Sequence, residues 1–154
     1  MSAEDRIRQL SIDLPPAPSP VASYVPVVVS GGLGFVAGQV ALADGRPMWT
    51  GKVGSGIDID EGSEAARRCA LQALAALRAE LGSLDRVERV VRVTVYVASA
   101  PGFTDQPKVA NGASDLLIEV FGDSGRHARA AVGVSELPLG APVEVELTVQ
   151  VAPA

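Results

Sequence analysis

The 154-residue sequence contains only one cysteine and one histidine, too few for several kinds of site. The single cysteine, Cys69, excludes an intramolecular disulfide and a cysteine-based zinc site. The single histidine, His127, argues against a histidine-rich site, so no metal is expected. Because disulfides are rare in reducing compartments, a chain with one cysteine is predicted to be cytoplasmic.

Aromatic side chains and positive charge are scarce as well. Aromatic residues make up 4% of the chain, and 13 Lys and Arg against 18 Asp and Glu give a formal net charge of −5. Proteins that bind nucleic acids need a basic surface to neutralise phosphates, and RNA-binding proteins commonly stack bases on aromatic side chains. The composition therefore argues against a nucleic-acid partner.

Long hydrophobic runs are also missing. Residues 14–43 carry no charged side chain, but five prolines and several polar residues interrupt them. No apolar run reaches the length of about 18 residues that a membrane span needs. The first residues mix acidic and basic side chains and contain no apolar signal-peptide core. We therefore predict neither a membrane span nor a secretory signal.

The length favours one domain over residues 1–154, because domains cluster at roughly 100–150 residues. A chain of this size buries about 68–70% of its unfolded surface, so its core needs no metal or disulfide. Residues 1–23 are expected to form an extended lead-in, because prolines at positions 15, 16, 18 and 20 cannot continue a helix or an inner strand.

Hydrophobic periodicity predicts strands and helices after this lead-in. β-branched or alternating runs predict strands at 24–30, 33–40, 87–98, 128–134 and 143–151. Apolar residues at helical spacing predict one helix from the Asp58 cap to Gly82 and a second at 104–121. The order β-β-α-β-α-β-β is typical of an α+β domain with both helices packed on one face of an open sheet.

Two local features complete this outline. Gly31 and Gly32 indicate a hairpin between the first two strands, and residues 43–59, rich in glycine, are predicted to form a long loop. Cys69 falls on the apolar face of the first helix, so we expect it to be a small core side chain.

Arg129 is the most informative polar residue of the predicted strand 128–134. Alternation places Ala128, Ala130, Val132 and Val134 on the core face, and His127, Arg129, Ala131 and Gly133 on the other face. Small neighbours leave room beside the guanidinium, which suits a carboxylate or phosphate because it binds two oxygens at once. The alternative is an ion pair between Arg129 and Glu144 or Glu146 on a neighbouring strand.

Three further polar side chains fall near this predicted recess. Glu144 begins the last strand beside a turn, where an ionised carboxylate can hold a water next to a ligand on Arg129. Glu146 shares the same polar face and is expected to be solvated or to face another subunit. His127 lies two positions before Arg129, where it either lines the recess or forms ordinary surface hydrogen bonds.

Several motifs together resemble the Rid family of reactive intermediate deaminases, also called YjgF-like or endoribonuclease L-PSP-like proteins. The most specific stretch runs from Arg129 to Val134 and is followed by Leu137-Pro138 and Val143-Glu144-Val145-Glu146. Ala37-Gly38-Gln39, Val93-Thr94-Val95-Tyr96-Val97 and Asn111 also match. The similarity covers residues 24–151 and implies a chorismate-mutase-like (YjgF-like) fold that assembles as a homotrimer with sites at the subunit interfaces.

The resemblance also implies a chemistry. Members related to RidA hydrolyse small carboxylate-bearing enamines and imines, such as 2-aminoacrylate and 2-iminopropionate, to 2-keto acids and ammonia without a cofactor. By motif position, Arg129 would bind the substrate carboxylate, and Glu144 would orient or activate the attacking water. Tyr24, Ala37 and Asn111 would lie beside the substrate, between subunits.

The chain departs from the RidA pattern at Ala37, where RidA-type members carry a serine. The missing hydroxyl would contact the water or the imine nitrogen, and Ser23, Ser30 or His127 would have to compensate for it. The alternative reading is therefore a non-catalytic trimer that binds a small carboxylic acid. A third reading, endoribonuclease activity, is opposed by the acidic charge and the scarce aromatics.

Two other departures concern the walls of the expected pocket. Ala131 stands where the family often has a cysteine two residues after the arginine. The loop 43–59 is longer than in RidA-type members and contains Trp49, which would cap or narrow a pocket. These features indicate a divergent branch of the family.

Overall fold

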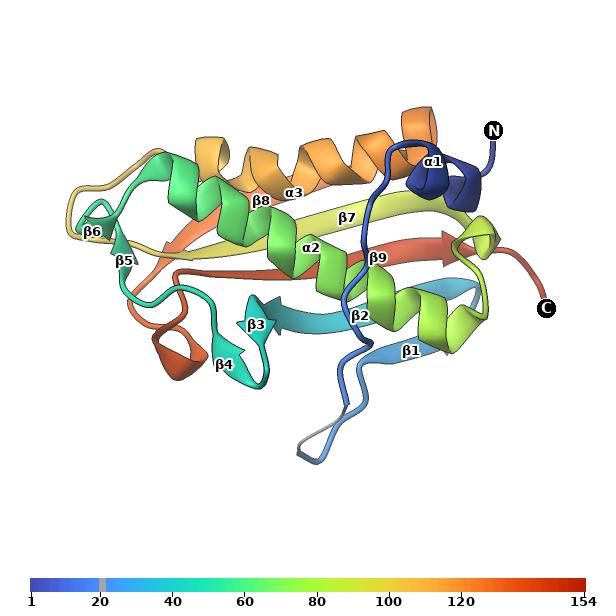
Figure 1. Ribbon diagram of the computed structural model, residues 1–154, viewed down its shortest axis with the longest axis horizontal. Coiled ribbons are helices and arrows are strands. Elements are labelled where there is room, and N and C mark those ends of the chain that lie inside the picture. The colour runs from blue at the N-terminus through green and yellow to red at the C-terminus, as the bar shows by residue number, and fades with distance from the viewer. Residues whose placement is uncertain (20–21) are drawn as a thin grey trace.

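The computed structural model describes residues 1–19 and 22–154 and shows an α+β domain of two layers (Figure 1). The long helices α2 (Ile59–Leu81) and α3 (Gln106–Phe121) lie side by side on one face of a five-stranded sheet. The strands of that sheet are β1 (Val27–Ser30), β2 (Leu33–Val40), β7 (Val87–Ala98), β8 (Ala128–Val134) and β9 (Val143–Val151). The predicted order of the main elements and the predicted fold class are confirmed.

The strands lie in the order β1-β2-β9-β7-β8, so β9 occupies the centre of the sheet and β8 one edge. β8 runs parallel to β7, whereas the other neighbours are antiparallel. A parallel pair needs a long crossover, and α3 supplies it between β7 and β8. This topology places the candidate residues of β8 and β9 on strands separated by β7.

The central strand β9 shows how the sequence produces a two-faced sheet. Val143, Val145, Leu147 and Val149 are buried beneath the helices, with exposed fractions of at most 3%. The residues between them are only half-buried or exposed and form an open face without helices. Strict alternation of apolar and polar residues therefore predicted both the strand and its orientation.

Helix α2 begins and ends at the predicted residues. Asp58 accepts a hydrogen bond from the Glu61 backbone N–H (2.8 Å), and the Glu61 carboxylate accepts one from the Asp58 N–H (3.0 Å). Gly82 ends the helix with φ 81°, which a glycine adopts without strain. Cys69 is fully buried on the inner face of the helix, as expected for a small core side chain.

The lead-in differs from the predicted extended segment. Residues Ala3–Gln9 form a short helix, α1, because Ser2 and Asp5 make a capping box at its start. Ile7 packs into the core, and Glu4 accepts hydrogen bonds from Arg78 Nε (3.0 Å) and from the Leu84 backbone N–H (3.0 Å). Of the predicted proline-rich run, Pro20 lies outside the described residues.

The first strand and the predicted loop also differ in detail from expectation. β1 begins at Val27, not at Tyr24, since Pro26 has no N–H to donate to a strand ladder. The segment 42–57, which covers most of the predicted loop 43–59, contains four two-residue strands and a partly buried Trp49 that packs against the core. These strands are β3 (Leu42–Ala43), β4 (Arg46–Pro47), β5 (Lys52–Val53) and β6 (Gly56–Ile57).

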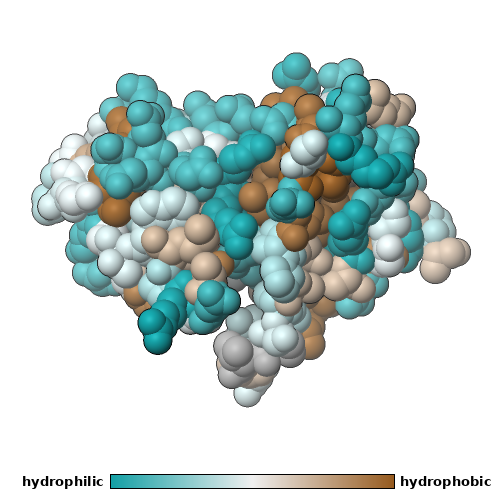
Figure 2. Space-filling view, viewed as in Figure 1, coloured by the Kyte–Doolittle hydropathy of each residue, from teal (hydrophilic) through white to brown (hydrophobic). Residues whose placement is uncertain are grey.

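Short 3-10 turns connect the remaining elements, and the helix-covered side of the molecule is largely hydrophilic (Figure 2). The turns are η1 (Leu84–Arg86), η2 (Gly122–Gly125) and η3 (Pro138–Gly140). Within residues 1–19 and 22–154, no helix is long and apolar enough to cross a membrane.

Candidate active site

Arg129 on β8 points toward helix α3, so the prediction that it faces away from the core was wrong. Arg129 pairs in register with Val93, a fully buried residue of β7, and its side chain reaches the helix. Val132, predicted to be in the core, is instead 42% exposed on the open face. β8 is an edge strand made mostly of alanine and glycine, and its hydropathy alternates too weakly to identify its buried face.

Polar side chains of α3 hold the Arg129 guanidinium. Nη1 of Arg129 donates to Oδ1 of Asn111 (2.9 Å) and to Oγ of Ser114 (3.1 Å). Ser114 Oγ lies 2.9 Å from Nε2 of His127, and Nδ1 of His127 lies 2.6 Å from the carbonyl oxygen of Gly125. Because a carbonyl only accepts, Nδ1 carries a proton, and in neutral His127 Nε2 accepts the Ser114 hydroxyl. The arginine is therefore fixed on one side by its own chain.

Glu144 lies on the opposite, open face of the sheet. Its strand β9 pairs with β7 so that Glu144 stands across from Tyr96. A bulge in β2 brings Gly38 against the carboxylate, where a Cβ on Gly38 would overlap an oxygen of Glu144. The absence of a side chain at position 38 thus makes room for the acid.

The surroundings of Glu144 favour its protonated form. Burial raises the pKa of the Glu144 carboxyl above its usual range, and the neighbouring Glu146 carboxylate adds to the rise. Tyr96 donates a hydrogen bond to Oε1 of Glu146 (2.6 Å), and this bond is the main cause of the raised pKa of Tyr96. A carboxyl group whose pKa is raised toward neutrality is suited to exchange protons with water.

A single chain does not bring Arg129 and Glu144 together. Their register partners on β7, Val93 and Tyr96, are three residues apart, and successive side chains of a strand point to opposite faces. The ion pair that we considered for Arg129 with Glu144 or Glu146 is therefore absent from the described residues, and Asn111 and Ser114 bind Arg129 instead.

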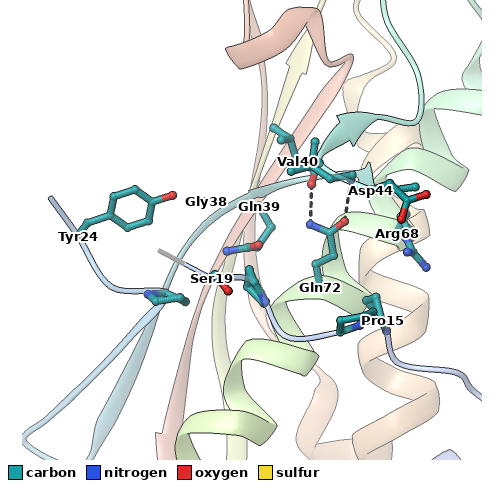
Figure 3. A pocket seen from close by; sticks show the side chains of 15 residues that line it. Pro15, Ser19, Tyr24, Gly38, Gln39, Val40, Asp44, Arg68 and Gln72 are labelled. Carbon is teal, nitrogen blue, oxygen red and sulfur yellow. Dashed lines mark hydrogen bonds between the residues drawn. The ribbon is translucent and has the colours of Figure 1, made fainter. Parts of the chain in front are cut away.

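Tyr24 and the segment after Ala37 meet at a cavity of about 610 Å³ beside the edge of β2 (Figure 3). Tyr24 is half-exposed, and its hydroxyl points toward Gly38, which also lines the cavity. Ala37 donates its N–H to the Pro26 carbonyl (2.8 Å) and accepts a bond from Gln39 Nε2 (3.1 Å). Both backbone polar groups of Ala37 therefore already form hydrogen bonds at this edge of the sheet.

The other residues predicted near the pocket lie elsewhere. Trp49 packs beside the core and Ala131 faces the helices, and neither lines this cavity. Of the three candidates to replace the missing serine hydroxyl, His127 is bonded to Ser114 on the helix side of the sheet. Ser30 lies at the hairpin turn, paired with Leu33 and remote from Ala37. Of the three, Ser23 therefore remains the candidate to replace the serine hydroxyl, because it is adjacent to Tyr24, which lines the cavity.

Sequence reasoning missed two residues of this arrangement, Ser114 and Gly38. Ser114 follows Asn111 by three residues, so both lie on one face of α3, and this spacing was a usable signal. The sequence shows Gly38 only as part of the Ala37-Gly38-Gln39 motif. Its contact with Glu144 depends on the bulge in β2, which the residue pattern does not reveal.

Comparison with known proteins identifies the family. The sequence profile of the endoribonuclease L-PSP family matches residues 15–151. Protein TCP17 of Trypanosoma cruzi is 50% identical over 145 residues, covering 94% of this chain and 91% of that protein. A 2-iminobutanoate/2-iminopropanoate deaminase of Dermatophagoides farinae is 31% identical over 136 residues, covering 88% of this chain and 91% of that protein.

A solved structure agrees with these sequence relatives. The crystal structure of a protein of unknown function from Agrobacterium tumefaciens superimposes with a TM-score of 0.89 and 40% sequence identity. The superposition covers 99% of this chain and 94% of the Agrobacterium tumefaciens chain. With a family match over most of its length and relatives above 30% identity, the chain belongs to the endoribonuclease L-PSP family, the Rid or YjgF-like family that its motifs predict.

Proposed function

We propose that this protein hydrolyses small carboxylate-bearing imines and enamines to 2-keto acids and ammonia. The observation that carries the proposal is the fixed guanidinium of Arg129. Its Nη1 is held by Asn111 and Ser114, while Nε and Nη2 have no hydrogen-bond partner among the described residues. A guanidinium held on one side and open on the other can bind both oxygens of a substrate carboxylate. The similarity to an imine deaminase supports the same chemistry.

Glu144 is the proposed proton acceptor. An enamine first becomes the imine when a proton leaves its nitrogen and another is added to its terminal carbon. Water then adds to the carbon of the C=N bond while Glu144 removes a proton from that water and passes it to the nitrogen. The tetrahedral adduct then collapses: Glu144 takes the hydroxyl proton and gives it to the nitrogen, the C–N bond breaks, ammonia leaves, and the hydroxyl oxygen becomes the keto oxygen. The raised pKa of Glu144 makes its carboxyl a better partner for this transfer than a fully solvated glutamate.

We further propose a homotrimer in which two copies of the chain complete each site. Arg129 and Glu144 lie on opposite faces within one chain, so a second copy has to bring one of them to the other. The open face of the sheet also exposes large apolar side chains, with Val28 at 49%, Phe35 at 45% and Val132 at 42%. Exposed apolar groups on an otherwise uncovered sheet face favour association.

The test couples a serine-dehydrating pyridoxal-phosphate enzyme to this protein and follows pyruvate release under conditions where spontaneous hydrolysis is slow. Arg129→Ala and Glu144→Gln should each lower kcat/KM by about 100-fold or more, through lost carboxylate binding and lost base catalysis respectively. Arg126→Ala is the matched control, since Arg126 is an exposed arginine on the loop before β8. Full turnover by Arg129→Ala would refute the assignment.

A non-catalytic carboxylic-acid-binding protein is the second candidate, favoured by one observation. Ala37 provides no hydroxyl where RidA-type proteins have a serine. If the wild-type trimer binds pyruvate through Arg129 but accelerates no imine hydrolysis, binding is the function. A monomer by light scattering would instead contradict the shared site.

A further inference from the structure

The cavity beside β2 extends well beyond the residues that the proposed reaction uses. Its volume of about 610 Å³ falls within the range of roughly 300–1,000 Å³ typical of small-molecule sites. It reaches from Tyr24 at one end to Arg68 of helix α2 and Asp44 of the β3–β4 hairpin at the other (Figure 3). Prolines of the lead-in and aliphatic side chains form most of its wall.

The sequence explains why this space stays open. β1 pairs with β2 only as far as Val27 and Val36, so within residues 1–19 and 22–154 no strand lies beside the outer edge of β2 after position 37. The segment that runs along this edge contains Pro15, Pro16 and Pro18, which have no N–H to donate to a ladder. The segment therefore passes the edge without pairing to it.

Arg68 is the cationic group on the α2 side of the cavity without a protein partner. Gln72, one turn further on, already donates to the Val40 carbonyl (2.7 Å) and accepts from the Leu42 N–H (2.7 Å). Arg68 has no ion pair or hydrogen bond within residues 1–19 and 22–154, and its buried Nε is the one unsatisfied buried side-chain atom found there. Buried donors in native proteins are satisfied with few exceptions, so this one points to a missing acceptor.

The cavity also adjoins the proposed reaction centre. Gly38 lines it, and the Glu144 carboxylate packs directly against Gly38. Glu144 itself lies on the open face of the sheet and Arg68 on a helix of the other face. A substrate whose imine carbon sits at Glu144 therefore reaches Arg68 only if its side chain passes Gly38 and turns around the edge of β2. Prolines, Val40 and Leu42 line this path together with Gln39 and Gln72, and its far end carries one charge of each sign, on Arg68 and on Asp44.

We propose that the cavity receives the side chain of the substrate, and that the preferred substrates are imines of dicarboxylic amino acids. This inference rests on the proposed function. The carboxylate next to the imine binds Arg129 of a neighbouring copy, the methylene groups lie against the apolar wall, and the distal carboxylate binds Arg68. Asp44 weakens the binding of the distal carboxylate, because its own carboxylate repels an anionic ligand. Asp44 forms no ion pair with Arg68 within the described residues.

The experiment compares two imines generated in situ by amino-acid oxidases, one from glutamate and one from norvaline, whose side chain is apolar and of similar length. The ratio of their kcat/KM values should favour the glutamate imine. Arg68→Gln should reduce this ratio by about 10- to 100-fold, the usual value of a hydrogen bond to a charged group. Arg67→Gln is the matched control, because it removes the same charge from the preceding residue, which instead pairs with Glu119 (2.9 Å).

A binding titration separates failure of this inference from failure of the proposed function. 2-Oxoglutarate should bind more tightly than 2-oxopentanoate, and Arg68→Gln should abolish the difference even if no imine is hydrolysed. Asp44→Asn should strengthen 2-oxoglutarate binding by about twofold to threefold, as expected for an exposed charge. Equal affinity for the two keto acids, or a preference that survives Arg68→Gln, would overturn the assignment of the cavity.

Discussion

The two halves of the candidate site differ in how completely one chain builds them. Arg129 faces α3, and Asn111 and Ser114 from the same chain fix its guanidinium. Glu144 faces the open side of the sheet, where it has no hydrogen-bond partner among residues 1–19 and 22–154 and its pKa is raised. One half is held in place by its own fold, and the other carries a carboxylate whose charged form the chain does not stabilise.

This difference indicates where the missing contacts belong. A partly buried carboxylate without a donor costs stability, and folded proteins retain such groups mostly where a ligand or partner uses them. The helix side of the sheet is closed by α2 and α3, whereas the side that carries Glu144 is uncovered. We therefore expect changes on the Glu144 side to act on catalysis, and changes on the Arg129 side to act on substrate binding.

Gly38→Ala should have the largest effect, because it breaks the Glu144 half without touching an ionisable group. The new Cβ would overlap the Glu144 carboxylate and push it from its position. Displacing a catalytic group by about 1 Å commonly costs about 100-fold, so kcat should fall by that amount while KM changes little. Steady-state kinetics with the serine-derived enamine measure both constants.

The background Glu144→Gln provides the control for this variant. If Gly38→Ala acts only through the carboxylate, it should cause little further loss of kcat in Glu144→Gln. Two losses that multiply in the double variant would show that Gly38 matters for another reason, such as the path of β2.

Asn111→Ala should have a smaller effect, confined to the Arg129 half. Without Oδ1 of Asn111, the guanidinium keeps only its bond to Ser114 and binds the substrate carboxylate less well. KM should rise about 10-fold with kcat nearly unchanged, since the lost positioning weakens ground state and transition state alike. Lys108→Ala, one turn earlier on α3 and exposed, should change neither constant. A fall in kcat alone would place Asn111 with Glu144 instead.

The fold was predictable because its signals are local and repeated. The alternation in β9, the apolar stripe of α2 and the capping pair Asp58–Glu61 each act over a few residues, and each was found where expected. Helix α1 was not predicted because it is short and mostly charged, so it has no repeated apolar face. Its one local signal is the capping box of Ser2 and Asp5. It gains its stability from distant contacts, such as that between Glu4 and Arg78, which no local pattern contains.

The site was less predictable because it depends on which way side chains of a weakly patterned strand point. Motif position drew attention to Arg129, Asn111 and Glu144, but alternation in an alanine-rich edge strand gave the wrong face for Arg129. Arg68 carried no sequence signal at all. It lies on an amphipathic helix among other arginines, and only the unpaired edge of β2 gives it a cavity to face.

Glu144→Gln and Arg129→Gln should change the free energy of unfolding in opposite directions. These changes are the smallest effects that we predict, and they compare the two halves of the site directly. Arg129→Gln loses bonds to Asn111 and Ser114 and should lower the free energy of unfolding by about 1 kcal/mol. Because the folded-state pKa of Glu144 is raised, its ionised form disfavours folding at neutral pH, and Glu144→Gln should raise the free energy of unfolding there.

The pH dependence tests the cause of that gain. Below the unfolded-state pKa of glutamate, wild-type Glu144 is protonated in both states, so the advantage of Glu144→Gln should disappear in acid and grow as pH rises through the folded-state pKa. Denaturant unfolding at several pH values and one fixed protein concentration measures it, since the stability of the proposed trimer would depend on protein concentration. A gain that is independent of pH would come from packing, and the carboxylate would then not be the strained part of the site.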